Sequence, residues 1–139
     1  MMKILVMLTF FLATVNCVQG QLKEDVLGVW KVNNTKKDIT YEFTKENFLY
    51  ITTSSYIEQD GKKNLLEKIE TFKFKNDYKE NQDYIDLGLY DSFMGEVIEI
   101  EKLIYQVYED KMVLCKSENS KIRPKDCQYI HGKIILIKM

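Results

Sequence analysis

The sequence predicts an all-β protein, an antiparallel up-and-down barrel of about eight strands that follows a short N-terminal helical turn. Apolar and polar residues alternate along most of the chain, which is the pattern of strands with one buried face. Short polar turns separate the apolar segments. Strands joined in this way must be antiparallel, because a parallel crossover needs about a dozen residues or more. A sheet of eight such strands loses both open edges when it closes into a barrel.

Each element is expected from its own residue pattern. Residues 21–27 can make one helical turn, because Glu24 and Asp25 stand where a helix N-terminus favours negative charge and Gly28 then ends it. Trp30 and Val32 share one face of the first strand. Further strands are expected at residues 39–44, 48–53, 84–87, 96–108, 112–115 and 133–137. One more strand is expected between 53 and 84, in a stretch that includes residues 69–74. Turns are expected near residues 45–47, 59–62, 76–82 and 109–111, and residues 91–95 form an irregular loop that exposes Phe93 and Met94.

Residues 1–20 are expected to be an export signal. Lys3 gives a positive start, and residues 4–15 are apolar except for two threonines. That run is too short to cross a bilayer as a helix and has the length of a signal-peptide core. Cleavage after Gly20 would release residues 21–139 as one secreted or periplasmic domain. Cys17 directly follows the run and keeps a second interpretation open, in which this cysteine is acylated and the protein is a lipoprotein held at a membrane by its lipid.

Composition argues against several classes of function. The formal net charge is −1, and no concentrated basic patch of the kind that binds nucleic acid is visible. Arg123 is the only arginine, so the chain lacks the guanidinium clamps that phosphoryl transfer normally uses. The single histidine, His131, stands outside any recognisable nucleophile or zinc-ligand pattern. We therefore expect no enzyme activity, no metal and no cofactor.

Two cysteines, Cys115 and Cys127, remain after removal of the signal. In an oxidising compartment an even pair is most simply interpreted as a disulfide, which would stabilise the fold by about 3 kcal/mol through loop closure. Two buried free thiols are the alternative.

The strand motifs resemble a known family. Gly28-Val29-Trp30-Lys31-Val32 at the start of an all-β chain is similar to the lipocalin-like domains of exported bacterial proteins. Residues 84–87, 104–115 and 134–138, together with Arg123-Pro124, resemble a lipocalin-like domain that occurs as repeats in planctomycete proteins and whose function is not established. The resemblance implies the barrel and leaves the activity open. Lipocalins carry an arginine over the tryptophan in the last strand, where this chain has Lys133 and Lys138.

Several side chains are candidates for a site. Trp30 is expected to close one end of the barrel, because an indole buries a large apolar surface. Arg123 is expected to pin a loop through backbone carbonyls, with an anionic ligand group as the alternative. The acidic residues of 91–101 are expected to lie on a solvated strand face, since they lack the pattern of a calcium loop. An aromatic set could line a ligand pocket or fill the core: Tyr41, Phe43, Tyr50, Phe72, Phe74 and Tyr105.

Two functions follow from these expectations. The first is a non-enzymatic binding module whose barrel mouth takes a small apolar or amphipathic ligand. The alternative is a structural or protein-interaction domain of the cell envelope with a filled barrel, which would use its outer surface and the loop that carries Phe93 and Met94. Neither function involves nucleic acid or a membrane-spanning segment.

Overall fold

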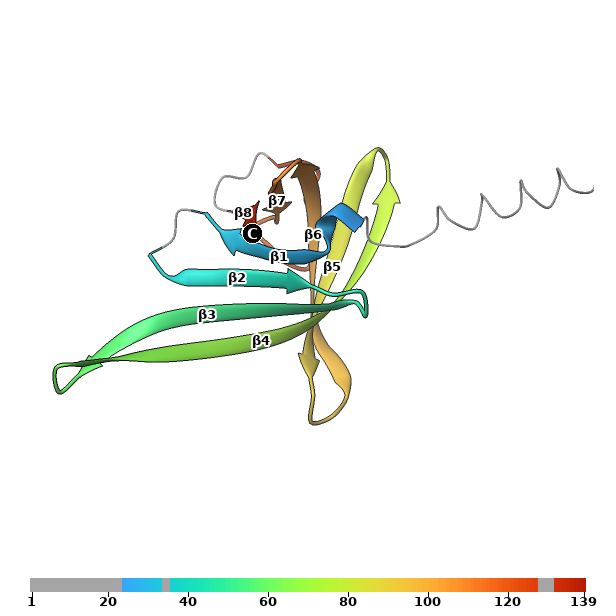
Figure 1. Cartoon of the computed structure of the whole chain (residues 1–139). Coiled ribbons are helices and arrows are strands. Elements are labelled where there is room, and N and C mark those ends of the chain that lie inside the picture. The colour runs from blue at the N-terminus through green and yellow to red at the C-terminus, as the bar shows by residue number, and fades with distance from the viewer. Residues whose placement is uncertain (1–23, 34–35, 128–131) are drawn as a thin grey trace, which may run out of the picture.

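The computed structural model describes residues 24–33, 36–127 and 132–139. These residues form one closed barrel of eight antiparallel strands, each hydrogen-bonded to the next in chain order and the last to the first (Figure 1). The predicted all-β, up-and-down barrel is therefore confirmed. The expected export segment at residues 1–20, including Cys17, lies outside the described residues, as does His131.

The strands have unequal lengths. The N-terminal helical turn is a single 3₁₀ turn, η1 (Glu24–Val26). The strands that follow are β1 (Gly28–Val32), β2 (Asp38–Phe43), β3 (Phe48–Gln59), β4 (Lys62–Lys79), β5 (Gln82–Asp91), β6 (Glu96–Tyr108), β7 (Lys111–Cys115) and β8 (Lys133–Lys138). The charged turn expected over residues 76–82 is smaller than predicted. Glu80 and Asn81 both adopt positive φ, 54° and 60°, so two residues suffice to connect β4 to β5.

Trp30 and η1 close one end of the barrel. Trp30 is fully buried, and its Nε1–H donates a hydrogen bond to the carbonyl oxygen of Val26 at 2.8 Å. The Lys138 ammonium lies 5.5 Å from the centre of the indole and also donates to the carbonyl of Asp25 at 3.3 Å. The indole is thus covered by one turn of backbone and by one cation. Of the two lysines of the last strand, Lys133 and Lys138, it is Lys138 that lies over the indole.

Large side chains fill the barrel above the indole. Inward residues of neighbouring strands lie opposite each other, as in the pairs Trp30–Tyr41 and Phe74–Leu87. The Phe43 and Phe74 rings meet edge to face with centroids 5.6 Å apart. The buried core consists of Val26, Trp30, Tyr41, Phe43, Leu49, Phe74, Ile85, Leu87, Leu103, Tyr105, Met112, Leu114 and Leu136. This part of the barrel is a packed hydrophobic core.

Two hairpins extend beyond the barrel at the end opposite η1. The β2–β3 pairing stops at Ser54, and β4 pairs with β5 only from Phe72 onward, so residues 55–70 form a two-stranded β3–β4 arm. Residues 90–101 form a shorter β5–β6 arm, because β6 pairs with β7 only from Ile104. The two arms leave the barrel in different directions (Figure 1).

A bulge bends the β5–β6 arm. Leu89 pairs with Glu99 but Tyr90 pairs with Val97, so Ile98 has no opposite residue on β5. The Val97 side chain lies directly over Gly88, where its Cγ1 would clash with any Cβ. The glycine therefore makes room for the bulged strand.

Replacing Trp30 with alanine is expected to lower the free energy of unfolding by about 3–5 kcal/mol, because a fully buried indole is replaced by a cavity. Chemical denaturation followed by circular dichroism measures the change, since Trp30 is the only tryptophan and its fluorescence is lost. Val29→Ala is the control on the exposed side of the same strand and should change stability by about 0.5 kcal/mol or less. Equal losses in the two variants would contradict the sealing role of the indole.

Gly88→Ala is expected to destabilise the protein by about 1–3 kcal/mol, because the added methyl group overlaps the Val97 side chain. Val97→Ala removes the overlapping atoms, so the double variant should recover most of that loss. A thermodynamic cycle over the two single variants and the double variant measures the coupling. Additive effects would show that the glycine is needed for another reason.

Candidate functional site: the cavity at the open end of the barrel

The predicted aromatic set does not form one pocket. Phe43, Phe74 and Tyr105 belong to the packed core. Tyr50 lies on the outer face, because side chains alternate along a strand and its neighbour Leu49 is fully buried inside. The Tyr50 ring stacks on Phe48 with centroids 6.1 Å apart.

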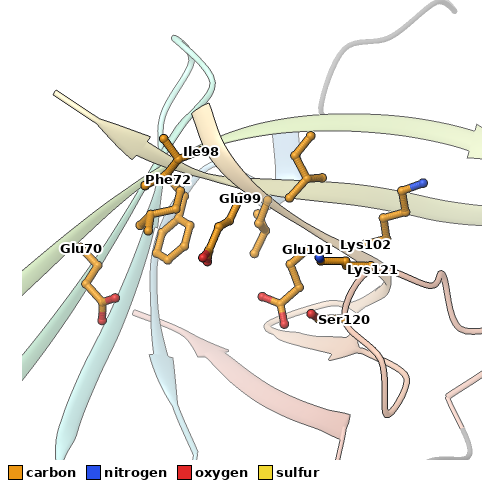
Figure 2. A pocket seen from close by; sticks show the side chains of 11 residues that line it. Glu70, Phe72, Ile98, Glu99, Glu101, Lys102, Ser120 and Lys121 are labelled. Carbon is orange, nitrogen blue, oxygen red and sulfur yellow. The ribbon is translucent and has the colours of Figure 1, made fainter. Parts of the chain in front are cut away.

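An open cavity of about 830 Å³ lies at the end of the barrel opposite η1, between β4, β5, β6 and the loop after β7 (Figure 2). Phe72 is the one member of the predicted aromatic set that lines it. The cavity exists because β7 and β8 have only five and six residues, so the barrel wall beyond β6 stops at Cys115. The lining residues are Glu70, Phe72, Leu87, Leu89, Ile98, Glu99, Ile100, Glu101, Lys102, Ser120 and Lys121.

The cavity combines an apolar lining with a charged rim. Phe72, Leu87 and Leu89 belong to the apolar part of the lining, and three carboxylates, from Glu70, Glu99 and Glu101, line the cavity together with Lys102 and Lys121 (Figure 2). Glu99 pairs with Leu89 and Glu101 pairs with Leu87, which places both glutamates on the inward face of β6. An amphipathic molecule would meet both apolar surface and charged groups in this cavity.

Two of these carboxylates have cationic neighbours. Glu101 lies 4.0 Å from the ammonium of Lys116, and Glu70 lies 3.8 Å from that of Lys68. Glu99 makes no ion pair with any residue in the part of the chain that the structure describes. Glu99 is therefore the carboxylate best placed to attract a cationic group of a ligand.

Glu99 is exposed and Glu101 is partly exposed, in line with the expected solvated strand face, but both stand on the inward side of β6. The apolar residues of β6 lie on one side of the strand up to Ile100 and on the other side from Leu103 onward. If Ile98 and Ile100 are taken to face the core, strand alternation places the neighbouring glutamates on the outer side. Counted backward from Leu103, which is buried in the core, the same alternation places Glu101 and Glu99 inside. The sequence carries no signal that Leu103, and not Ile98 or Ile100, faces the core.

Tyr41 links the packed core to the charged rim. It is 9% exposed, and burial, followed by the charges of Glu101 and Glu70, raises the pKa of its phenol from 10.0 to about 12. The phenol of Tyr105, which lies towards the closed end of the barrel, also has a raised pKa. Burial and then the carboxylates of Asp83 and Asp25 raise the pKa of its phenol. Both phenols are thus held in the neutral form.

Arg123 fixes the loop that borders the cavity. Its Nη1 donates to the carbonyl of Leu103 at 2.8 Å, its Nη2 lies 2.5 Å from a carboxylate oxygen of Asp86, and its guanidinium lies 4.5 Å from the centre of the Tyr84 ring. The sequence led us to expect a backbone carbonyl as the partner of Arg123, and the Leu103 carbonyl is one. The ion pair with Asp86 was not expected. These contacts hold the guanidinium on the outer side of β5 and β6.

A disulfide anchors the same loop. Cys115 and Cys127 are bonded, with Cα atoms 5.4 Å apart, which confirms the predicted pairing. Between them, the carbonyl of Ser120 accepts a hydrogen bond of 2.8 Å from the backbone N–H of Lys102. Ser120 and Lys121 are therefore held at the border of the cavity beside β6 (Figure 2).

Within residues 24–33, 36–127 and 132–139, no group of three or more His, Cys, Asp or Glu side chains is placed to hold a metal ion. The same residues contain no helix with the length and apolar character needed to cross a membrane.

Comparison of the chain with models of known protein families, with curated proteins and with solved structures finds no match.

The raised pKa of Tyr41 predicts a loss of stability at high pH. Below pH 10 the phenol is neutral in both the folded and the unfolded chain, so its contribution is fully present. Between pH 10 and about 12 the unfolded chain releases the proton while the folded chain keeps it, and the free energy of unfolding falls by up to about 1.4 kcal/mol per pH unit.

Urea denaturation at a series of pH values measures this decline. Tyr41→Phe should make the decline above pH 10 less steep, because one shifted phenol is removed. Tyr56→Phe is the matched control on an exposed tyrosine and should leave the slope unchanged. A Tyr41→Phe slope equal to that of the unmodified protein would contradict the coupling.

Proposed function

We propose that the protein is a non-enzymatic binding module whose site is the cavity at the open end of the barrel, and that its ligand is amphipathic. The apolar part of the ligand would pack on Phe72, Leu87 and Leu89, and a cationic group would lie near Glu99. The observation that carries the proposal is an open cavity above a filled core, in which apolar side chains lie beside Glu99, a carboxylate that has no ion-pair partner within the described residues.

The size and the position of the cavity support this proposal. Small-molecule sites usually measure about 300–1,000 Å³ and combine apolar walls with a few polar groups. The packed core below leaves the ligand at the mouth and not deep inside the barrel. The lipocalin-like resemblance of the Gly28-Val29-Trp30 motif agrees with a ligand at the barrel mouth.

We further infer that the protein works in an oxidising compartment outside the cytoplasm, as a secreted, periplasmic or lipid-anchored protein. The Cys115–Cys127 disulfide supports this location, because such bonds persist mainly in secreted and periplasmic proteins. The expected export segment at residues 1–20 agrees with it, and mass spectrometry of the mature protein would distinguish cleavage near Gly20 from acylation of Cys17.

A second candidate function is protein interaction through the two arms. Phe93 is 97% exposed at the tip of the β5–β6 arm, and Met94 beside it is 63% exposed. The β3–β4 arm exposes Tyr56, Ile57, Leu65, Leu66 and Ile69. Exposed apolar groups of this extent are typical of interaction surfaces.

Octylammonium and octanoate test the binding proposal, because they share a chain length and differ in charge. NMR titration should show octylammonium shifting the signals of Phe72, Leu87 and Leu89 at concentrations where octanoate does not. Glu99→Gln should weaken octylammonium binding about two- to fivefold, which is the usual strength of an exposed charge pair.

Glu96→Gln is the matched control. Glu96 lies on the same strand and outside the cavity lining, so this change should leave the affinity unaltered. Equal binding of the two amphiphiles, or signals that move only on the arms, would contradict the proposed site.

A further inference from the structure

We propose that the ligand of this cavity is an extended polypeptide segment that adds as a strand to the free edge of β6. This inference rests on the proposed binding function of the cavity and names the chemical class of its ligand. Four observations carry it. They are an open strand edge, a cavity that follows that edge, an acidic hairpin without basic residues, and the repulsion between glutamates if β6 of a second copy paired with this edge.

The first observation is the free edge. Residues 96–103 of β6 pair with β5 on one side, while pairing with β7 on the other side begins at Ile104. The backbone N–H of Lys102 donates to Ser120 of the loop, so it points away from β5. Because backbone groups alternate along a strand, the N–H and C=O of Ile100 point to the same side. Within the described residues, no strand pairs with Ile100 on that side.

The second observation is the course of the cavity. Five consecutive residues of β6, from Ile98 to Lys102, line it. Side chains of consecutive residues point to opposite faces, so a cavity lined by all five follows the strand backbone as well as its inner face. Ser120 and Lys121 form the opposite border (Figure 2). An added strand would lie along Ile98 and Ile100 of β6, on the arm side of the hydrogen bond between Lys102 and Ser120, where the wall formed by β7 and β8 has ended.

The third observation is charge. Residues 80–101, which include β5 and the whole β5–β6 arm, contain seven acidic residues and no lysine or arginine. Glu99 and Glu101 point inward, while Ile98 and Ile100 are 56% and 55% exposed. Cross-strand neighbours on one face interact directly, so a segment with alternating basic and apolar residues would match both faces of β6. Its basic side chains would face the glutamates, and its apolar side chains would cover the isoleucines.

The fourth observation argues against β6 of a second copy as the occupant. Antiparallel pairing of residues 97–101 with the same residues of another chain would place glutamates opposite or diagonal to glutamates, and like charges opposite each other are destabilising. A small amphiphile can occupy the apolar part of the cavity but cannot pair with both the backbone N–H and the C=O of Ile100 as a strand does. A polypeptide supplies both the side chains and the backbone groups, as in strand addition to other open sheet edges.

The probe is the acetylated and amidated peptide Lys-Val-Lys-Val-Lys-Val, measured by isothermal titration calorimetry with the full oxidised chain. Its control has the same sequence with every backbone amide N-methylated, which keeps the charges and removes the hydrogen-bond donors. We expect the control to bind at least tenfold more weakly. Equal affinity of the two peptides would overturn strand addition and leave the binding function of the cavity intact.

Octylammonium separates the two proposals. Binding of octylammonium without binding of the peptide overturns this inference alone, whereas binding of neither overturns the proposed function as well. Octylammonium and the unmethylated peptide should compete, since both occupy the same cavity. Simultaneous binding of the two would contradict a shared site.

Hydrogen exchange locates the added strand without any substitution. The amide of Ile100 should exchange at least tenfold more slowly when the peptide is bound, because it gains a hydrogen-bond partner. The amide of Glu101 points to β5 and serves as the control in the same strand, so its exchange rate should not change. Peptide binding without protection of Ile100 would overturn the inference.

Discussion

The barrel depends on the short junction between its first and last strands. Three residue pairs join β1 to β8, among them Trp30 with Lys138. The side chains of these two residues also meet, since the Lys138 ammonium lies over the indole. One tryptophan thereby connects η1, β1 and β8, and its hydrogen bond to Val26 fixes the turn that covers the end of the barrel. Without this junction, β1 and β8 would each present an open edge, and the core between them would be exposed to water.

The unequal strand lengths determine where binding can occur. β1, β2, β7 and β8 have five or six residues, while β3 to β6 have ten or more. At the η1 end, β4 continues past the end of β3 and pairs with β5 up to a two-residue turn. At the opposite end, the excess length of β3 to β6 forms the two arms. The same inequality produces both arms and removes the wall beside β6. A barrel of eight equal strands would have neither the cavity nor the free edge.

The sequence allowed the architecture to be predicted because period-two alternation and short polar turns are local signals. The disulfide was predictable because only two cysteines follow the expected export segment. The extent of β4 was missed, since Leu65 and Leu66 are adjacent and break the alternation. The inward position of Glu99 and Glu101 was missed because the apolar side of β6 changes along the strand. The ion pair between Arg123 and Asp86 joins residues far apart in sequence, and no local pattern could indicate it.

The loop between β7 and β8 makes one border of the cavity depend on the redox state of the compartment. Ser120 and Lys121 stand beside β6 in a segment that is closed by the Cys115–Cys127 bond and held by Arg123 and by the hydrogen bond from Lys102 to Ser120. In a reducing environment the covalent tie is absent, and these non-covalent contacts alone oppose the conformational entropy of the segment. One border of the cavity is therefore held more firmly after thiol oxidation than before it.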